Sequence, residues 1–220
     1  MTVAGSTPIP VVTIDGPASS GKGTVAAALA GRLDWHLLDS GAIYRVVAYG
    51  VLQQQLDGQD VEAVLKLIRD MALRFSNGHI WYNVEDVTYA IRTPACSEAT
   101  SQISAIADVR AALLKAQRSF MREPGLVADG RDMGTVVFPD AGLKIFLTAS
   151  ARVRAERRLK QLSNQGISVN LADLERDIMT RDERDSNRAV SPLRPADDAM
   201  VIDSSTMTPE EVLDTILQQL

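Results

Sequence analysis

The sequence is poor in cysteine and lysine and has no long apolar run, and these shortages exclude several classes of protein. The single cysteine, Cys96, excludes an internal disulfide and a cysteine-based zinc cluster, and it fits a reducing compartment. No stretch approaches the ~18 apolar residues that a membrane span needs, and the opening MTVAGSTPIP lacks the basic start and apolar core of a signal peptide. The net charge of −5 argues against nucleic acid as a partner. We therefore expect neither a membrane nor a nucleic-acid partner.

Arginine carries most of the positive charge of this protein, and lysine is scarce. Of the 23 basic residues 18 are arginine and 5 are lysine, and 13 of the arginines lie between Arg110 and Arg194. The planar guanidinium group grips a phosphate or carboxylate at two points, whereas lysine offers a point charge. An acidic protein with an arginine-rich second half therefore predicts a small anionic ligand.

Strand and helix patterns alternate along most of the 220 residues. The β-branched run PVVTID leads into a glycine-rich loop and a helix, and the run WHLLD leads into the next helix. LVAD, LKIFLTA and AMVIDSS are three more buried strands, which gives five core strands. This alternation predicts an α/β fold, a doubly wound five-stranded parallel sheet. Helices are expected over 21–33, 40–55, 60–74, 151–165 and 170–188, within 94–121, and after Thr208.

One segment departs from the α/β pattern. Two alternating runs lie on either side of Asn77-Gly78, and a third lies over 87–91. Asn-Gly between alternating runs is the strongest short hairpin signal. We therefore predict a small inserted antiparallel sheet.

The segment IDGPASSGKGT has the spacing of a nucleotide phosphate loop. Gly16, four further residues, Gly21 and Lys22 follow a strand and open a helix. Such glycines let backbone amides point at phosphates, and the helix N-terminus adds partial positive charge. Because Gly23 follows the lysine, Thr24 is the candidate Mg²⁺ ligand. The predicted ATP-binding residues are Gly16, Pro17, Ala18, Ser19, Ser20, Gly21, Lys22, Gly23 and Thr24.

A dinucleotide-binding fingerprint competes for the same residues. Gly21, Gly23 and Ala26 satisfy G-x-G-x-x-A, and Asp39 lies 18 residues beyond Gly21. That fingerprint needs its first glycine directly after the strand, but the strand ends six residues earlier at Asp15. The nucleotide phosphate loop is therefore the favoured interpretation, and an NAD-dependent oxidoreductase is the weaker alternative.

Three polar segments are candidates for the second half of the site. LLDSGAIYR and VADGRDMGTVVFPDA each follow a core strand, so they reach the crevice where ligands bind in such sheets. TRDERDSNR places Arg181, Arg184 and Arg188 on one helix face, beside Asp185, although solvated ion pairs are also compatible with that spacing. With Arg154, Arg157 and Arg158 of the preceding helix, these arginines favour a flap that closes on an anion.

No catalytic base stands out in the sequence. If the nucleotide donates its phosphoryl group to an acceptor that is itself a phosphate, no base is required. His36 and His79 lie in strand-like runs beside tryptophans, so we expect both to be packed. The second pKa of a phosphate monoester is near 6, so the acceptor is mostly a dianion at pH 7. Catalysis then requires alignment and charge neutralisation by lysine, arginine and Mg²⁺.

The segments GPASSGKGT, LLDSGAIYR, ADGRDMGTVVFP, KIFL and RDERDSNRAVSPL together resemble those of the bacterial cytidylate kinases, P-loop nucleoside monophosphate kinases. The resemblance runs from about Ile14 to the C-terminal helix. It implies ATP-dependent phosphorylation of CMP or dCMP by a cytoplasmic monomer. We predict that Mg²⁺ assists and that the phosphoryl group moves directly, without a covalent enzyme intermediate.

The resemblance also divides the chain into three parts. The core domain is expected to cover residues 1–39, 106–151 and 190–220. Residues 40–105 would form the monophosphate-binding domain, which contains the antiparallel sheet. Residues 152–189 would form an arginine-rich lid.

Recognition of CMP is implied residue by residue. Ser40, Asp132 and Arg188 are expected to read the cytosine and its amino group, and Asp185 is expected to hold the sugar hydroxyls. The residues expected to surround CMP are all polar or charged and come from four separate segments. They are Ser40, Arg45, Ser101, Arg110, Asp129, Arg131, Asp132, Asp185 and Arg188.

The catalytic residues implied by the resemblance are Lys22, Arg131, Arg158 and Arg181, all of them cationic. Arg110 and Arg131 are expected to hold the acceptor phosphate, and Lys22, Arg158 and Arg181 to bridge the transferring group. Two other functions stay open at this point. One is a P-loop kinase for UMP or a phosphorylated metabolite. The other is a GTP-hydrolysing switch, although the sequence lacks the guanine-reading N-K-x-D motif.

Overall fold

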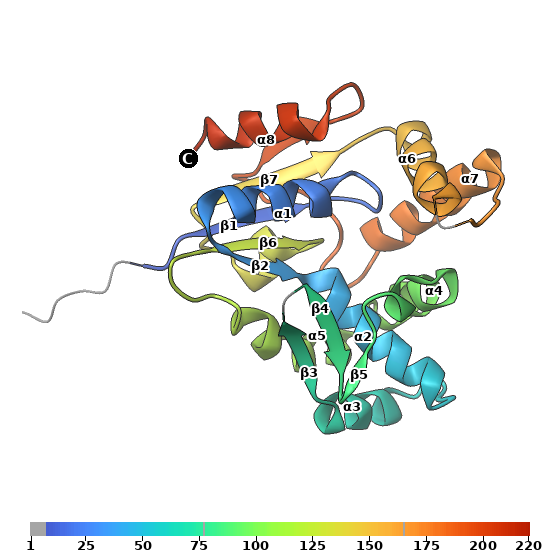
Figure 1. The fold of residues 1–220 in the computed structure, drawn as a ribbon. Coiled ribbons are helices and arrows are strands. Elements are labelled where there is room, and N and C mark those ends of the chain that lie inside the picture. Colours follow the sequence, from blue (N-terminus) through green and yellow to red (C-terminus); the bar gives the residue numbers. More distant parts are fainter. Residues whose placement is uncertain (1–7, 77, 165) are drawn as a thin grey trace, which may run out of the picture.

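A five-stranded parallel sheet forms the centre of the protein (Figure 1). The computed structural model describes residues 8–76, 78–164 and 166–220. The strand order is β2-β6-β1-β7-β8, and each neighbouring pair is parallel. The predicted α/β fold with five core strands is confirmed. The strands are β1 (Val11–Asp15), β2 (His36–Asp39), β6 (Leu126–Gly130), β7 (Leu143–Thr148) and β8 (Met200–Asp203).

Helices cover both faces of this sheet, and each face has its own hydrophobic cluster. On β1, Val12 and Ile14 pack toward α1 and α8, whereas Val11 packs toward α2 and α5 (Figure 1). Within the described residues no helix is both long and apolar enough to cross a membrane. The helices are α1 (Lys22–Leu33), α2 (Ser40–Gln53), α3 (Val61–Asp70), α4 (Pro94–Ile103), α5 (Ala107–Arg118), α6 (Ala151–Ser163), α7 (Leu171–Ser186) and α8 (Pro209–Leu217).

The predicted inserted sheet is present next to α2 and α3. Strands β3 (Leu73–Ser76) and β4 (His79–Tyr82) are antiparallel, with Ser76 opposite His79. The two strands therefore pair up to the positions on either side of the predicted turn. Asn77 itself lies outside the described residues, and Gly78 has a φ of +78°.

The prediction of a third strand over 87–91 is wrong. The third strand, β5, is Glu85–Asp86, and a 3₁₀ helix follows at Ala90–Arg92. The Asp86 carboxylate accepts hydrogen bonds from the Thr88 backbone N–H and hydroxyl, at 3.0 and 2.5 Å. This local turn of the chain competes with strand pairing, so the alternating pattern beyond it does not extend the sheet.

The carboxyl ends of the parallel strands bring several polar residues to one edge of the sheet. Asp15 is in register with Gly130, and Asp39 is in register with Asp129. Three segments that are far apart in the sequence therefore meet there: the loop after β1, the start of α2 directly after β2, and the loop after β6. This is the edge at which ligands bind in open α/β sheets.

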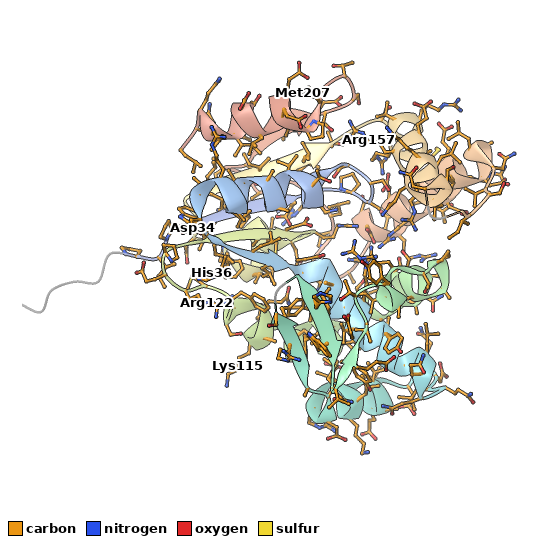
Figure 2. All side chains as sticks on the ribbon, viewed as in Figure 1. Asp34, His36, Lys115, Arg122, Arg157 and Met207 are labelled. Atoms are coloured by element: carbon orange, nitrogen blue, oxygen red, sulfur yellow. The ribbon has the colours of Figure 1, made fainter. Side chains whose placement is uncertain are left out.

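The two histidines lie elsewhere. His36 is the first residue of β2, at the opposite end of the strand (Figure 2), and its Nε2 lies 2.8 Å from the Glu123 carbonyl oxygen. His79 is exposed and its Nδ1 lies 2.6 Å from an Asp86 oxygen, so the expected packing of His79 is wrong.

Gly16 begins the loop between β1 and α1, and the packing there leaves no room for a side chain. Its φ is +155°, and a Cβ would lie 2.0 Å from the Leu147 carbonyl oxygen. We expect Gly16→Ala to force the loop away from β7 and to lower the melting temperature by about 5–10 °C. Thermal unfolding followed by circular dichroism measures the effect.

Gly31 provides the matched control, because a Cβ there meets no atom within 4 Å. It lies in α1, where alanine is favoured over glycine by about 1 kcal/mol. Gly31→Ala should therefore melt at or above the wild-type temperature. A Gly16→Ala protein that melts like the wild type would contradict the close approach.

Candidate active site

The loop 16–21 has the geometry of a phosphate-binding loop. Gly21 precedes α1 in a left-handed conformation with φ +93°, and no described side chain caps the helix. The first backbone N–H groups of α1 therefore remain available to an anion, next to the positive end of the helix dipole. Lys22 is buried at the start of the helix, and its Nζ donates to the Pro17 carbonyl oxygen at 3.1 Å.

This loop forms one wall of a cavity of about 1330 Å³. The other walls come from the start of α2, the loop after β6, and helices α4, α6 and α7. The described lining contains neither histidine and includes most of the sequence-predicted site residues. The exceptions are Gly16, Pro17 and Ser101. Ser101 is 1% exposed, and its hydroxyl accepts a hydrogen bond from Arg184 at 3.0 Å, so it supports the wall from behind.

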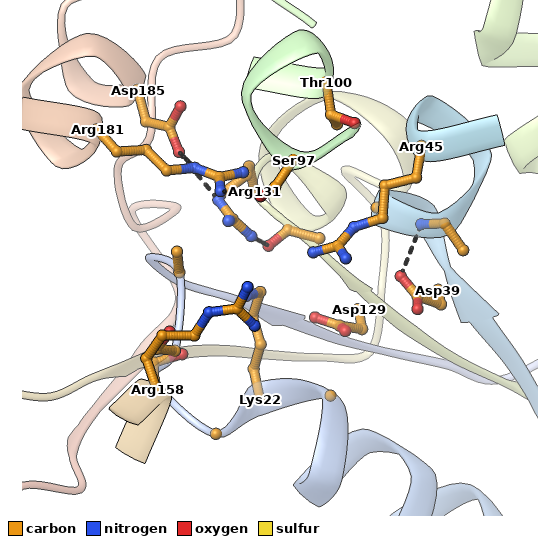
Figure 3. Close-up of a pocket in the computed structure, with 18 of the residues that line it drawn as sticks. Lys22, Asp39, Arg45, Ser97, Thr100, Asp129, Arg131, Arg158, Arg181 and Asp185 are labelled. Atoms are coloured by element: carbon orange, nitrogen blue, oxygen red, sulfur yellow. Dashed lines mark hydrogen bonds and ion pairs between the residues drawn. The ribbon is translucent and has the colours of Figure 1, made fainter. Parts of the chain in front are cut away.

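Lys22 and Asp129 are buried side chains of opposite charge, on the phosphate loop side and on the sheet respectively (Figure 3). Burial lowers the pKa of the Lys22 ammonium, and Arg131 lowers it further. Burial also raises the pKa of the Asp129 carboxyl. Asp129 Oδ1 has no hydrogen-bond partner among the described residues. The site thus holds both charges at a cost, which a bound polyphosphate and cation would offset.

Asp15 anchors the loop that follows β6. Its Oδ1 accepts the backbone N–H of Met133 and its Oδ2 that of Gly134, both at 2.8 Å. These bonds hold the start of a π-helical turn, Met133–Val137, where the sequence alone indicates only a loop. They fix the preceding Arg131 and Asp132 relative to the phosphate loop. No local sequence pattern indicates this role, because the partners of Asp15 lie more than 100 residues away along the chain.

Burial makes Asp15 a source of pH-dependent stability. It raises the pKa of Asp15 from 3.8 to about 6, although the two backbone N–H donors act in the opposite direction. The folded protein therefore retains this proton to a higher pH than the unfolded chain does. The stabilising contribution is complete below the unfolded pKa and is lost as the pH rises through about 6.

We expect Asp15→Asn to remove this pH dependence. The unfolding free energy of the wild type relative to the variant should fall by on the order of 3 kcal/mol between about pH 4 and about pH 7.5. Urea unfolding of both proteins at matched pH values gives the difference. A constant difference over this range would show that Asp15 titrates at its ordinary value.

Three arginines converge on the carboxylate of Asp185, which is 0% exposed. Arg188 Nη2 lies 2.5 Å from Oδ1, and Arg131 Nε and Arg181 Nε lie 3.2 and 4.0 Å from Oδ2. Burial alone would raise the pKa of Asp185, but the three arginines lower it below its usual value. Burial and Arg131 lower the pKa of Arg181 to about 10. The single Asp185 carboxylate thus neutralises only part of the positive charge of the three arginines. This cluster of Asp185 and three arginines can therefore still bind an anion.

Further cations face this cluster across the cavity. Arg158 and Lys22 lie on one side, Arg131 and Arg181 on the other, and Arg45 points in from α2 (Figure 3). Burial lowers the pKa of Arg158, and Arg45 lowers it further. Five cations pointing into one cavity in an acidic protein make a site for a highly charged anion.

A separate group of side chains lines the end of the cavity beside α5. The buried Arg110 pairs with the Asp132 carboxylate through Nη2, and its guanidinium carbon lies 5.4 Å from the centre of the Tyr44 ring. Ser40 is the first residue of α2, and its hydroxyl donates to Gln117 Oε1 at 2.8 Å. The resemblance implies that Arg110 holds the acceptor phosphate; in the structure Arg110 contacts Asp132 and lies beside the Tyr44 ring.

Two arginines of the predicted flap, Arg154 and Arg157, bind other parts of the protein in this structure. Arg154 is buried, with Nη2 2.5 Å from Asp182, so it joins α6 to α7. Arg157 donates to the carbonyl oxygens of Ser20 and Ser204, at 3.0 and 2.7 Å. Arg154 therefore serves the packing of this region, and Arg157 supports the phosphate loop. The proximity of Arg157 to the loop could not be read from helical spacing alone.

Helix α7 also contacts α4 across the cavity mouth. Arg181 Nη1 donates to the Ser97 hydroxyl at 3.1 Å, and Arg184 Nη1 lies 3.1 Å from Glu98 Oε1. Ser97 and Glu98 belong to a segment without a recognisable motif, so the sequence alone does not identify them as part of the site. Through these contacts the arginine-bearing helix covers the cavity.

A divalent cation would have few protein ligands here. The described residues contain no cluster of three or more His, Cys, Asp or Glu side chains that could hold a metal. Thr24 lines the cavity on the first turn of α1, and the unpartnered Asp129 Oδ1 lies nearby. This fits Mg²⁺, which is usually held by one or two protein groups together with substrate phosphates and water.

A phosphate loop at the carboxyl edge of a parallel sheet, facing arginines across one cavity, defines the class of the P-loop kinases. The sequence profile of the cytidylate kinases matches residues 12–220. The chain belongs to the cytidylate kinase family.

Individual relatives agree with this assignment. The chain is 53% identical over 219 residues to a cytidylate kinase of Stutzerimonas stutzeri, which covers 97% of this chain and 96% of the relative. It is 52% identical over 211 residues to a cytidylate kinase of Burkholderia vietnamiensis, covering 96% and 92% of the two chains. An uncharacterised protein of Eubacterium ventriosum of known structure shares the fold at 10% identity, with a TM-score of 0.51 over 96% of this chain and 97% of its own.

Proposed function

We propose that this protein transfers the terminal phosphoryl group of ATP to CMP, or to dCMP, and releases ADP and the corresponding diphosphate. The observation that carries the proposal is a single cavity with a phosphate loop at one end and the Ser40, Arg110 and Asp132 group at the other. The half-buried Arg45, Arg131, Arg158 and Arg181 line the same cavity (Figure 3). Membership of the cytidylate kinase family supports the same reaction.

ATP would bind with its phosphates on the loop 16–21. The uncapped N–H groups at the start of α1 donate to the phosphate oxygens, and Lys22 adds a positive charge. Mg²⁺, when bound, neutralises phosphate charge, and Thr24 and Asp129 are the groups that would hold it, directly or through water. Arg157 supports the loop from α6 through Ser20.

Cytosine would bind beside α5. Its amino group is a donor, and the Ser40 and Asp132 oxygens are acceptors at the cavity wall. Its N3 and O2 are acceptors, and Arg110 and Arg188 are donors. In uracil, N3 carries a hydrogen and donates, and O4 accepts, so the pattern at these two positions is the reverse of that in cytosine. We therefore assign Arg110 to the base, together with Asp132, and leave Arg131 as the main ligand of the acceptor phosphate.

The transfer itself requires alignment and charge neutralisation. Asp185 would hold the sugar hydroxyls, while Arg131 turns toward the CMP phosphate. Lys22, Arg158 and Arg181 would surround the phosphoryl group as it moves. Because the acceptor phosphate is already mostly ionised at pH 7, no side chain needs to remove a proton, and the transfer is direct.

Two of the three predicted parts of the chain would surround the acceptor in this reaction. Residues 40–105 would form the acceptor domain, and residues 152–189, with α6 and α7, would form the lid. The contacts of Arg181 with Ser97 and of Arg184 with Glu98 join these two parts around the acceptor. We further propose that the enzyme acts as a cytoplasmic monomer, with nucleotides as its partners.

A panel of acceptors tests the proposed function. ADP release from Mg-ATP is measured with CMP, dCMP, UMP, AMP or no acceptor, and the products are separated and identified. Turnover with CMP and dCMP that yields the diphosphates supports the proposal. Hydrolysis without any acceptor, or transfer only to another molecule, would be consistent with the phosphate loop but would refute the cytosine site.

A further inference from the structure

Helix α5 carries two buried polar side chains on one otherwise apolar face. Arg110 and Gln117 are seven residues apart, two turns of the helix, and Val109 and Leu113 lie buried on the same side. Arg110 reaches Asp132, and Gln117 reaches Ser40. Each of these two buried polar residues therefore contacts one of the two acceptors proposed for the cytosine amino group.

Gln117 itself does not belong to the described lining of the cavity. It is 1% exposed, and Ser40, which it contacts, is 4% exposed and does line the cavity. The Ser40 hydroxyl donates its hydrogen to Gln117 Oε1 at 2.8 Å. The Ser40 hydroxyl therefore gives Gln117 a route by which it can affect a bound base.

A serine hydroxyl has a single hydrogen, and its direction decides what the oxygen offers to a ligand. While Ser40 donates to Gln117, only the lone pairs of its oxygen point at the cavity. In a buried site, leaving the Gln117 carbonyl without a donor costs free energy, so the hydroxyl stays in this direction. Asp132, which pairs with Arg110, is an acceptor as well, because a carboxylate has no hydrogen to donate.

We propose that Gln117 is a specificity-determining positioning residue, which holds the Ser40 hydroxyl as an acceptor and so favours cytosine over uracil. The inference rests on the proposed function, in which the base lies between Ser40 and Asp132. The cytosine amino group has two N–H bonds, one for each acceptor. The O4 of uracil would face two acceptors and no donor.

Replacement of Gln117 by leucine tests the proposal. Gln117→Leu keeps a similar volume but removes the acceptor, so the Ser40 hydroxyl can turn and donate to O4 of uracil. The preference for CMP over UMP, expressed as the ratio of kcat/KM values, should fall about tenfold. The change should appear mainly in KM, since the phosphate loop and the arginines are untouched. Gln117→Met repeats the test with an unbranched side chain should the leucine variant fail to fold.

Two further variants act as controls. Gln117→Glu retains an acceptor oxygen and should keep most of the preference for CMP. Lys115→Leu changes the exposed side of the same helix, where Lys115 points away from the protein (Figure 2), and should leave the ratio unchanged.

A double substitution separates this role from a merely structural one. In a Ser40→Ala background there is no hydroxyl to direct, so adding Gln117→Leu should not change the CMP to UMP ratio further. A further change would show that Gln117 acts by displacing α5, and would overturn the inference. An unchanged ratio in a folded Gln117→Leu single variant would overturn it as well. If the wild type itself shows no preference for CMP, the proposed function fails, which is a distinguishable result.

Discussion

Replacing Lys22 by alanine is expected to lower kcat by about 10²–10³-fold, because the variant loses the cation whose ammonium group is held within the phosphate loop. Lys22 is buried at the first position of α1, and its ammonium is held near Pro17 within the loop itself. Its charge therefore lies where the phosphates of ATP would bind, in surroundings that strengthen electrostatic interactions. The measurement is the steady-state rate of CDP formation at saturating ATP and CMP.

The matched control is Lys160→Ala, which removes an exposed lysine from α6. This variant should retain the wild-type rate. Both proteins should show cooperative thermal unfolding, so that a loss of rate is not a loss of fold. A Lys22→Ala enzyme within about threefold of the wild-type rate would show that the phosphate loop has been misinterpreted.

Replacing Asp132 by asparagine is expected to lower the preference for CMP over UMP by about 10–100-fold. The carboxylate offers only acceptors to the base, whereas the amide of asparagine can also donate to O4 of uracil. Asparagine has nearly the same shape and still leaves an oxygen for Arg110, so the pocket is preserved better than with alanine. The ratio of kcat/KM for CMP and UMP gives the result.

Asp140→Asn, at an exposed position soon after the same loop, serves as the control. It removes one negative charge without touching the cavity, and its CMP to UMP ratio should equal that of the wild type. An Asp132→Asn enzyme with unchanged preference would place the base elsewhere in the cavity.

Local patterns in the sequence were sufficient to predict the sheet and the phosphate loop. The spacing of Gly16, Gly21 and Lys22 between a strand and a helix needs only neighbouring residues to be interpreted. The same holds for the hairpin, where Ser76 pairs with His79 across the predicted turn. In each case the physical cause of the structure lies within about ten residues.

The rest of the site depends on contacts between distant segments, which no local pattern contains. The ion pair of Arg110 with Asp132 crosses 22 positions, and the hydrogen bond of Ser40 with Gln117 crosses 77. Arg110 could therefore be identified as a site residue by resemblance, whereas its partner, and hence its proposed role at the base, came only from the structure. Gln117 has no motif of its own and was not predicted.

The most direct test of the central claim is a competition between acceptors for a labelled phosphoryl group. ATP labelled in its γ-phosphate is incubated with the enzyme, Mg²⁺ and equal concentrations of CMP, UMP and AMP, and the labelled products are separated. The account predicts that the label appears chiefly in CDP, with no labelled protein that turns over to product. Label found mainly in free phosphate, in UDP or ADP, or on such a protein species would contradict it.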